Sequence, residues 1–175
     1  QVKKIPVTIN PHRVRADRYG QLWITSRGDY KDVPSQLVLI ENVESGVKNE
    51  QGIHNSKFII QKLTIPSSEM VILGDSLFFY GVNWNTQTET NNIWYGIVDV
   101  KTHTLLSEQI ITDGTEMNIK VPYGIQINPY NGDIYITDAK NYVSSGQLHC
   151  YSRSGKKKWS VRTGDIPAHM CFVYR

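Results

Sequence analysis

The sequence predicts an all-β fold built from repeated four-stranded sheets, and three observations indicate this. A segment led by proline, residues 11–25, returns as residues 122–137, and a divergent copy, residues 67–80, lies between them. The three copies are spaced by 55 and 57 residues. Helical periodicity is nearly absent, while short strand patterns bounded by turn residues follow each copy. Repeats of this length, made of strands and turns, predict a stacked or radial repeat protein.

Each copy predicts four strands, recognised by apolar or β-branched runs between turn signals. The first repeat has Asp-Arg-Tyr-Gly at 17–20 as its first turn and residues 41–56 as a long connection; its expected strands are Arg13–Ala16, Leu22–Thr25, Gln36–Ile40 and Phe58–Leu63. The second has a tight turn at 101–104, and its strands are Met70–Leu73, Leu77–Val82, Ile93–Val100 and Leu105–Ile111. The third has an Asn-Pro turn at 128–132, and its strands are Gly124–Asn128, Asp133–Thr137, Gln147–Tyr151 and Lys158–Arg162.

Four antiparallel strands per unit at this spacing predict a β-propeller with blades at 11–66, 67–121 and 122–166. A lone strand, Ile5–Ile9, precedes them, and residues 167–175 open a further blade. A solenoid needs a shorter and more regular period, and a sandwich does not repeat its own strand-turn-strand signature. Three blades in an open arc leave two apolar faces in water. Either the terminal strands form a partial fourth blade, or the chain is part of a larger ring, which we favour.

Composition indicates a globular domain, with 39% hydrophobic and 20% charged residues and a net charge of +3. The basic run 156–158 follows a turn, so we interpret it as a solvated edge strand and expect no nucleic-acid partner. Cys150 and Cys171 lie in different repeats; two buried thiols are favoured, and a disulfide stays open. No Cys or His motif for zinc, no 18-residue apolar run and no lipidation signal is present, so we expect no metal and no transmembrane segment.

The third repeat resembles a known family. The segments that carry the resemblance are 122–125, 131–142, 146–151 and 163–169, and they are similar to the C-terminal end of YncE-like seven-bladed propellers. The nearest group is the bacterial surface proteins of the BtuG type, lipoproteins that capture cobalamin and pass it to a TonB-dependent transporter. The resemblance implies the C-terminal half of a seven-bladed ring, a location at the cell surface or outer membrane (otherwise the periplasm), and a corrinoid as ligand rather than cofactor.

In a propeller, the loops that lead into the innermost strands and the loops between the second and third strands ring one face of the channel, where ligands bind. Tyr30 and Tyr142 each fall five residues after a strand-ending threonine, and Asp29 and Asn141 precede them. These pairs either cap the loop and pack the ring on the neighbouring blade, or contact ligand directly.

Trp84, followed by Asn85, stands in an amide-rich loop. An aromatic among amides gives a flat apolar surface with many hydrogen-bond partners, which suits a corrinoid or a sugar. Trp84 is therefore the leading contact residue.

Three further candidates lie one or two residues after the proline that begins each predicted blade: His12, Tyr123 and His169. They are candidates for ligand contact, with a hydrogen bond to backbone as the alternative for each histidine. Arg13 and Arg27 lie on the same face and are candidates for phosphate or carboxylate groups, or are simply solvated.

Signals for catalysis are weak, because no nucleophile elbow, Walker loop or H-E-x-x-H motif is present. The acidic residues are scattered, and nothing fixes a pair at acid–base separation. The leading hypothesis is a non-catalytic binding propeller. The alternatives are a scaffold for a partner protein and a calcium-dependent hydrolase using Asp138, Asn141, Asn83 and Asn85.

Overall fold

The computed structural model describes residues 4–29, 32–48 and 54–173, which form three four-stranded antiparallel sheets and one short 3-10 helix. The first sheet contains β1 (Pro11–Ala16), β2 (Leu22–Ser26), β3 (Gln36–Lys48) and β4 (His54–Leu63). The second contains β5 (Glu69–Leu73), β6 (Ser76–Asn85), β7 (Thr90–Asp99) and β8 (Thr104–Ser107). The helix η1 (Thr115–Asn118) leads to the third, which contains β9 (Pro122–Ile127), β10 (Ile134–Asp138), β11 (Gln147–Tyr151) and β12 (Lys157–Arg162).

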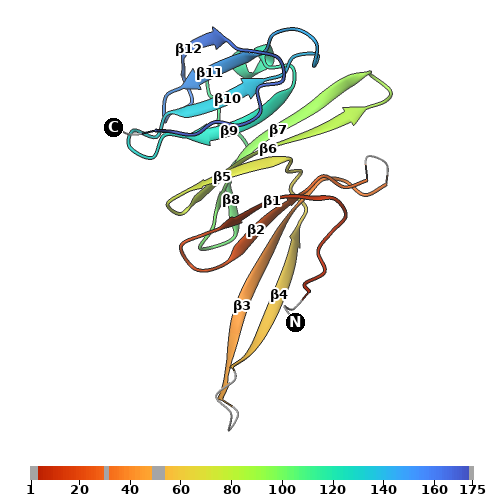
Figure 1. Ribbon diagram of the computed structural model, residues 1–175, viewed down its shortest axis with the longest axis vertical. Helices are drawn as coiled ribbons and strands as arrows, with labels where there is room; N and C mark the ends of the chain where they lie inside the picture. The colour runs from red at the N-terminus through yellow and green to blue at the C-terminus, as the bar shows by residue number, and fades with distance from the viewer. Residues whose placement is uncertain (1–3, 30–31, 49–53, 174–175) are drawn as a thin grey trace.

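The all-β class and the four-stranded antiparallel unit are confirmed. In every sheet the spatial order of the strands follows the chain, and the sheets follow one another along the long axis of the molecule (Figure 1). They meet along their first strands, because β1 contacts β5 and β5 contacts β9. This is the arrangement of propeller-like blades, and the described residues do not close a ring.

Two apolar cores hold the sheets together. Between the first two sheets lie Trp23, Leu37, Leu39, Met70, Leu77, Phe79, Val98 and Val100. Between the second and third lie Val71, Tyr80, Ile110, Ile111, Ile119, Ile125, Ile127, Ile134, Ile136 and Tyr151. Burial of each such large side chain contributes about 1.5–3 kcal/mol relative to exposure. The middle sheet therefore supplies side chains to both cores, one from each of its faces.

The turn between β1 and β2 shows how the sequence signal works. Asp17 accepts hydrogen bonds at Oδ1 from the backbone N–H groups of Tyr19 (2.8 Å) and Gln21 (3.0 Å). Its Oδ2 accepts from Trp23 Nε1 at 2.8 Å, and both residues are buried. Gly20 supplies the left-handed backbone conformation, at φ 78°. One carboxylate thus closes the turn and fixes the largest core side chain.

Several predicted boundaries are wrong because two hairpins are longer than expected. The predicted connection 41–56 is largely strand, since β3 and β4 pair as far as Lys48 and His54. The expected loop 83–92 is shortened to a turn, since β6 and β7 pair as far as Asn85 and Thr90. Both hairpins project from their sheets in Figure 1. The fourth strand of the second repeat, β8, is shorter than predicted and ends at Ser107.

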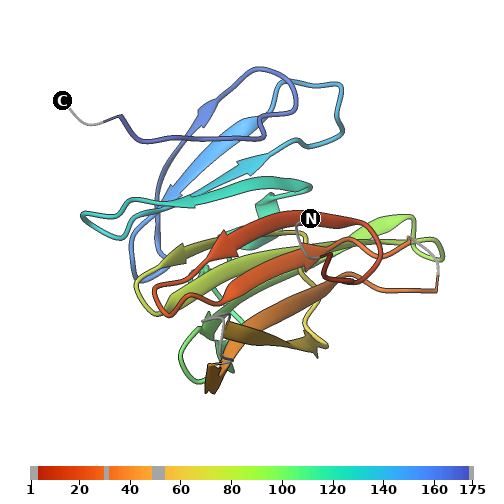
Figure 2. The ribbon, with the colours of Figure 1, turned by 60° about the horizontal axis from the view of Figure 1, so that its bottom comes forward.

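The predicted terminal strands are also wrong, because neither terminal segment pairs with a strand in the described part of the chain. At the N-terminus, Ile5 and Val7 pack against the first sheet. At the C-terminus, the segment 167–173 runs beside the third sheet (Figure 2). Its Phe172 ring lies 5.4 Å from that of Tyr135, edge to face. Both segments therefore cover outer sheet faces without joining a ladder.

The two cysteines are free thiols and differ in exposure. Cys150 lies buried in β11, as predicted. Cys171 is exposed, which corrects the prediction of two buried thiols, because the C-terminal segment lies on the surface.

Candidate functional site

The residues singled out from separate repeats meet at one cavity, which we call the rim cavity. It has a volume of about 340 Å³ and opens between the second and third sheets, beside the loop that follows β2. Its lining residues are Arg27, Ser68, Tyr80, Val82, Trp84, Asn91, Val121, Pro122, Tyr123 and Tyr142. Four of these, Arg27, Trp84, Tyr123 and Tyr142, are predicted site residues.

Trp84, Tyr123 and Tyr142 contribute aromatic surface to the wall of the rim cavity. Tyr123 of β9 and Tyr142, in the loop after β10, meet edge to face with ring centroids 5.7 Å apart. Trp84 projects from β6 and is exposed, although it lies in a strand and not in the predicted loop. The wall therefore offers flat apolar surface to a ligand.

The Asx residues beside these aromatics have turn-forming roles. Asn141 Oδ1 accepts hydrogen bonds from the N–H groups of Val143 (3.1 Å) and Ser144 (2.8 Å). Asn141 therefore caps its loop, which is one of the two roles that the sequence predicts for it. Its partner Tyr142 packs on Tyr123 of the same sheet, whereas a contact with the neighbouring sheet was expected. The capping leaves Tyr142 at φ 63°, turned onto the cavity wall.

Asn85 and Asp29 close turns in the same way. Asn85 Oδ1 accepts the N–H groups of Gln87 (2.9 Å) and Thr88 (3.3 Å) at the tip of the β6–β7 hairpin. Asp29 Oδ1 accepts the N–H of Val33 at 2.8 Å. Neither lines the rim cavity. The remaining candidate of this group, Tyr30, lies outside the described residues.

The polar side of the cavity is electrostatically simple. Of the described residues that line the cavity, Arg27 alone is charged. Burial, and then the nearby Glu69 carboxylate, raises the pKa of Tyr80 well above its ordinary value, so the phenol stays protonated. Beside the cavity, burial and the Arg27 charge lower the pKa of His12. Neutral His12 forms a hydrogen bond with the backbone of Ser68, whose carbonyl oxygen lies 3.1 Å from Nδ1. This backbone hydrogen bond is the alternative to ligand contact that the sequence analysis gives for His12.

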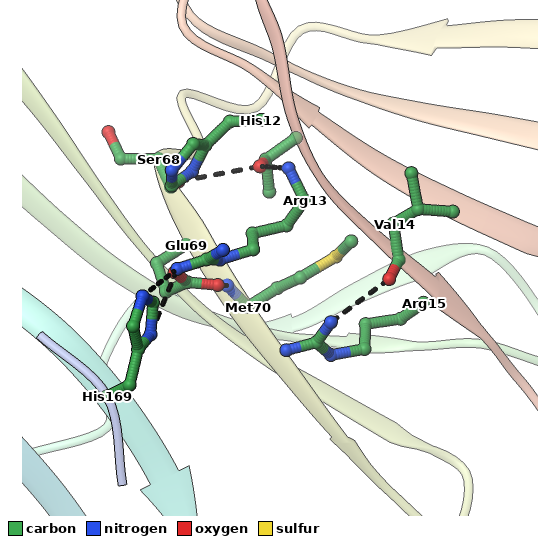
Figure 3. Close-up of polar contacts among 9 residues, drawn as sticks. His12, Arg13, Val14, Arg15, Ser68, Glu69, Met70 and His169 are labelled. Atoms are coloured by element: carbon green, nitrogen blue, oxygen red, sulfur yellow. Dashed lines mark hydrogen bonds and ion pairs between the residues drawn. The ribbon is translucent and has the colours of Figure 1, made fainter.

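Arg13 and His169 form a separate cluster below the rim, drawn in Figure 3. Arg13 extends from β1 between Glu69 of β5 and His169 of the C-terminal segment. Its Nε donates to Glu69 Oε2 at 2.6 Å, and its Nη2 lies 3.1 Å from each ring nitrogen of His169. The Arg13–Glu69 pair joins the first sheet to the second. Neither Arg13 nor His169 lines the rim cavity. Their side chains instead contact each other, and Arg13 also contacts Glu69.

Asp138, a candidate calcium ligand, forms hydrogen bonds with backbone N–H groups next to the strands of its own sheet. Asp138 is buried and accepts the N–H groups of Val121 (2.8 Å), Lys140 (2.8 Å) and Lys120 (3.2 Å). In the described ranges, no three His, Cys, Asp or Glu side chains are grouped so that they could hold a metal ion.

The sequence interpretation missed the cavity's strand residues, chiefly Tyr80, Val82 and Asn91. Tyr80 and Val82 lie two residues apart in a strand whose apolar pattern predicts burial in a core. No sequence signal indicates that a cavity opens between the sheets beside them. The sequence predicts a loop over 83–92, where the structure has the end of a hairpin with Asn83 paired to Asn92.

Two comparisons with known proteins complete the description of the site. No protein-family model matches the chain, and no curated protein is significantly similar to it. In the described part of the chain, no helix is both long and apolar enough to cross a membrane. The resemblance to YncE-like propellers therefore stays a prediction.

Proposed function

We propose that this chain is a non-catalytic, ligand-binding propeller domain and that the rim cavity is its binding site. The observation that carries the proposal is the convergence of Arg27, Trp84, Tyr123 and Tyr142, from three repeats, on one cavity. Its volume of about 340 Å³ is within the range of small-molecule sites. Loops and strand ends on a rigid sheet scaffold are the usual location of such sites.

The lining residues define the class of ligand. Aromatic walls stack on flat or apolar surface, and one arginine with one asparagine hydrogen-bonds polar groups at fixed positions. A large polar ligand with a flat face, such as a corrinoid or a sugar, has these features. The corrinoid is the first candidate because of the family resemblance. Since a corrinoid is larger than the cavity, one part of it enters and the rest lies across the rim.

The larger setting of this function is also a proposal. We infer a seven-bladed ring at the bacterial cell surface or outer membrane, lipid-anchored in the full-length protein, that delivers its ligand to a TonB-dependent transporter. Apolar side chains on the outer face of the third sheet support further blades, since Trp159 and Val161 are exposed there.

Titration with cyanocobalamin tests the ligand. Isothermal titration calorimetry is expected to give a dissociation constant in the micromolar range or tighter. Trp84→Ala is expected to weaken binding about tenfold, because it removes a stacking surface worth about 0.5–1.5 kcal/mol beyond its buried area. Trp159→Ala is the matched control: Trp159 is 43% exposed against 59% for Trp84, and it lies outside the cavity. Equal effects of the two substitutions would contradict the rim cavity as the binding site. No binding by the unaltered chain would refute the corrinoid as its ligand.

A partner-protein scaffold is the second candidate, favoured by apolar residues around the rim. Met117 and Val143 are strongly exposed, and Met117 shares a neighbouring cavity with Trp84. Transporter capture that survives Trp84→Ala but is lost when the loops are exchanged supports this function. The calcium-dependent hydrolase stays a prediction, and calcium-dependent turnover of a lactone or ester panel is its test.

A further inference from the structure

The second sheet has an incomplete outer edge. Strand β7 pairs with β6 along its whole length, from Thr90 to Asp99. On its other side it pairs with β8 only from Ile97 to Asp99. In the described part of the chain no strand pairs with this side of residues 90–96. Every second residue of that stretch therefore presents its backbone N–H and C=O outward over about 23 Å, at the usual rise of an extended strand.

A groove follows this free edge, and we call it the edge groove. It has a volume of about 470 Å³ and includes Ile93, Trp94 and Tyr95 of β7. Residues 64–66, which connect the first sheet to the second, form part of its lining, as do residues 108–111, which follow β8. Phe79, Leu105 and Ile110 add apolar surface. Open backbone groups with apolar side chains alongside are the two requirements for adding one extended strand.

The charge of the edge groove is acidic. Among the described residues that line the groove, Glu108 and Glu116 are charged and none is a lysine or an arginine. One oxygen of Glu116, Oε2, is buried with no hydrogen-bond partner in the described part of the chain, and the same is true of the Tyr95 hydroxyl. A buried carboxylate oxygen needs a hydrogen-bond donor, and a basic side chain supplies a charged one.

We propose that the edge groove docks an extended basic segment of a partner protein, which adds to the free edge of β7 as a fifth strand of the second sheet. Main-chain hydrogen bonds to residues 90–96 provide affinity without regard to sequence. The apolar lining beside Trp94 and the two glutamates select alternating apolar and basic side chains, because successive residues of a strand point to opposite faces. The site is separate from the rim cavity and does not depend on the function proposed for it.

A labelled decapeptide of alternating valine and lysine is the probe, and its fluorescence anisotropy is measured against the 175-residue chain. Two further versions carry N-methyl groups on alternate residues, so that each loses the hydrogen-bond donors of one peptide edge. The expected result is saturable binding, lost at least tenfold in one N-methylated version and kept in the other. Equal binding of both versions, or no saturable binding below about 1 mM, would overturn the proposal.

Charge variants test the selectivity. Glu108→Gln is expected to weaken peptide binding about two- to fivefold, the usual range for a solvent-reached ion pair. Glu116→Gln is expected to weaken it by more, at least about tenfold, because its Oε2 is buried and the pair it forms is shielded from water. Asp165→Asn, which removes an exposed carboxylate outside the groove, is the control and should leave binding unchanged. Sedimentation velocity detects the competing occupant: a dimer that excludes the peptide would overturn the proposal in favour of pairing between two copies of the chain.

Discussion

The Arg13–Glu69 ion pair is expected to be a main polar contact between the first two sheets, and Arg13→Ala tests this. The side chains are 23% and 7% exposed, and Nε donates to Oε2 at 2.6 Å. Glu69 also accepts the N–H of Met70 at 3.1 Å, so its carboxylate stays in place when arginine is removed. Leaving a buried charge without its partner costs about 3–5 kcal/mol. Because water reaches part of Arg13, we expect the lower end, a loss of about 3 kcal/mol in the free energy of unfolding.

A second ion pair between the same sheets provides the control. Arg18 and Asp75 approach to 3.5 Å and are 63% and 45% exposed. Arg18→Ala should therefore cost at most about 1 kcal/mol. Both variants are measured by urea unfolding followed by tryptophan fluorescence, and a double-mutant cycle with Glu69→Gln isolates the pair. Equal costs for Arg13→Ala and Arg18→Ala would refute the reasoning. Unchanged stability with lost ligand binding would place Arg13 in the binding site.

Two further predictions concern the third sheet. Burial, with a smaller contribution from Lys157, lowers the pKa of His149, so folding keeps the ring neutral and stability falls as the pH drops below about 6.5. His149→Leu should reduce that loss, measured as urea midpoints at about pH 7.5 and about pH 5, and an unchanged difference contradicts it. A Cβ at position 124 would collide with the carbonyl oxygen of Ala168. Gly124→Ala should displace the C-terminal segment and speed tryptic cleavage after Arg162, whereas protection equal to that of the unaltered chain contradicts it.

Local patterns predicted much of the fold, because strand alternation and turn chemistry are written in neighbouring residues. Asp17 with Gly20, for example, marks the first turn, and the same carboxylate anchors Trp23. Loop capping by Asn141, one of the two roles left open for it, is likewise found in the structure. The repeat spacing then placed Trp84, Tyr123 and Tyr142 on one face of the molecule, and the structure finds them at one cavity.

Contacts between repeats were not predictable in this way. Arg13 meets Glu69 across 56 residues and His169 across 156, and no pattern in one repeat reports on a partner in another. The terminal segments read as strands because they are apolar, but strand structure also requires an edge to pair with. They pack on sheet faces instead, as Val7 and Phe172 do.

The two separate cores have a consequence for cooperativity. Leu77 and Phe79 belong to one, while Val71 and Tyr80, on the opposite face of the same sheet, belong to the other. When each unit contacts only its neighbours, the stability of the array is a sum of nearest-neighbour terms. Losing either outer sheet removes one of those terms, whereas losing the middle sheet removes both. Denaturation should therefore advance from the two ends of the chain, and amide protons of β6 should be the slowest to exchange.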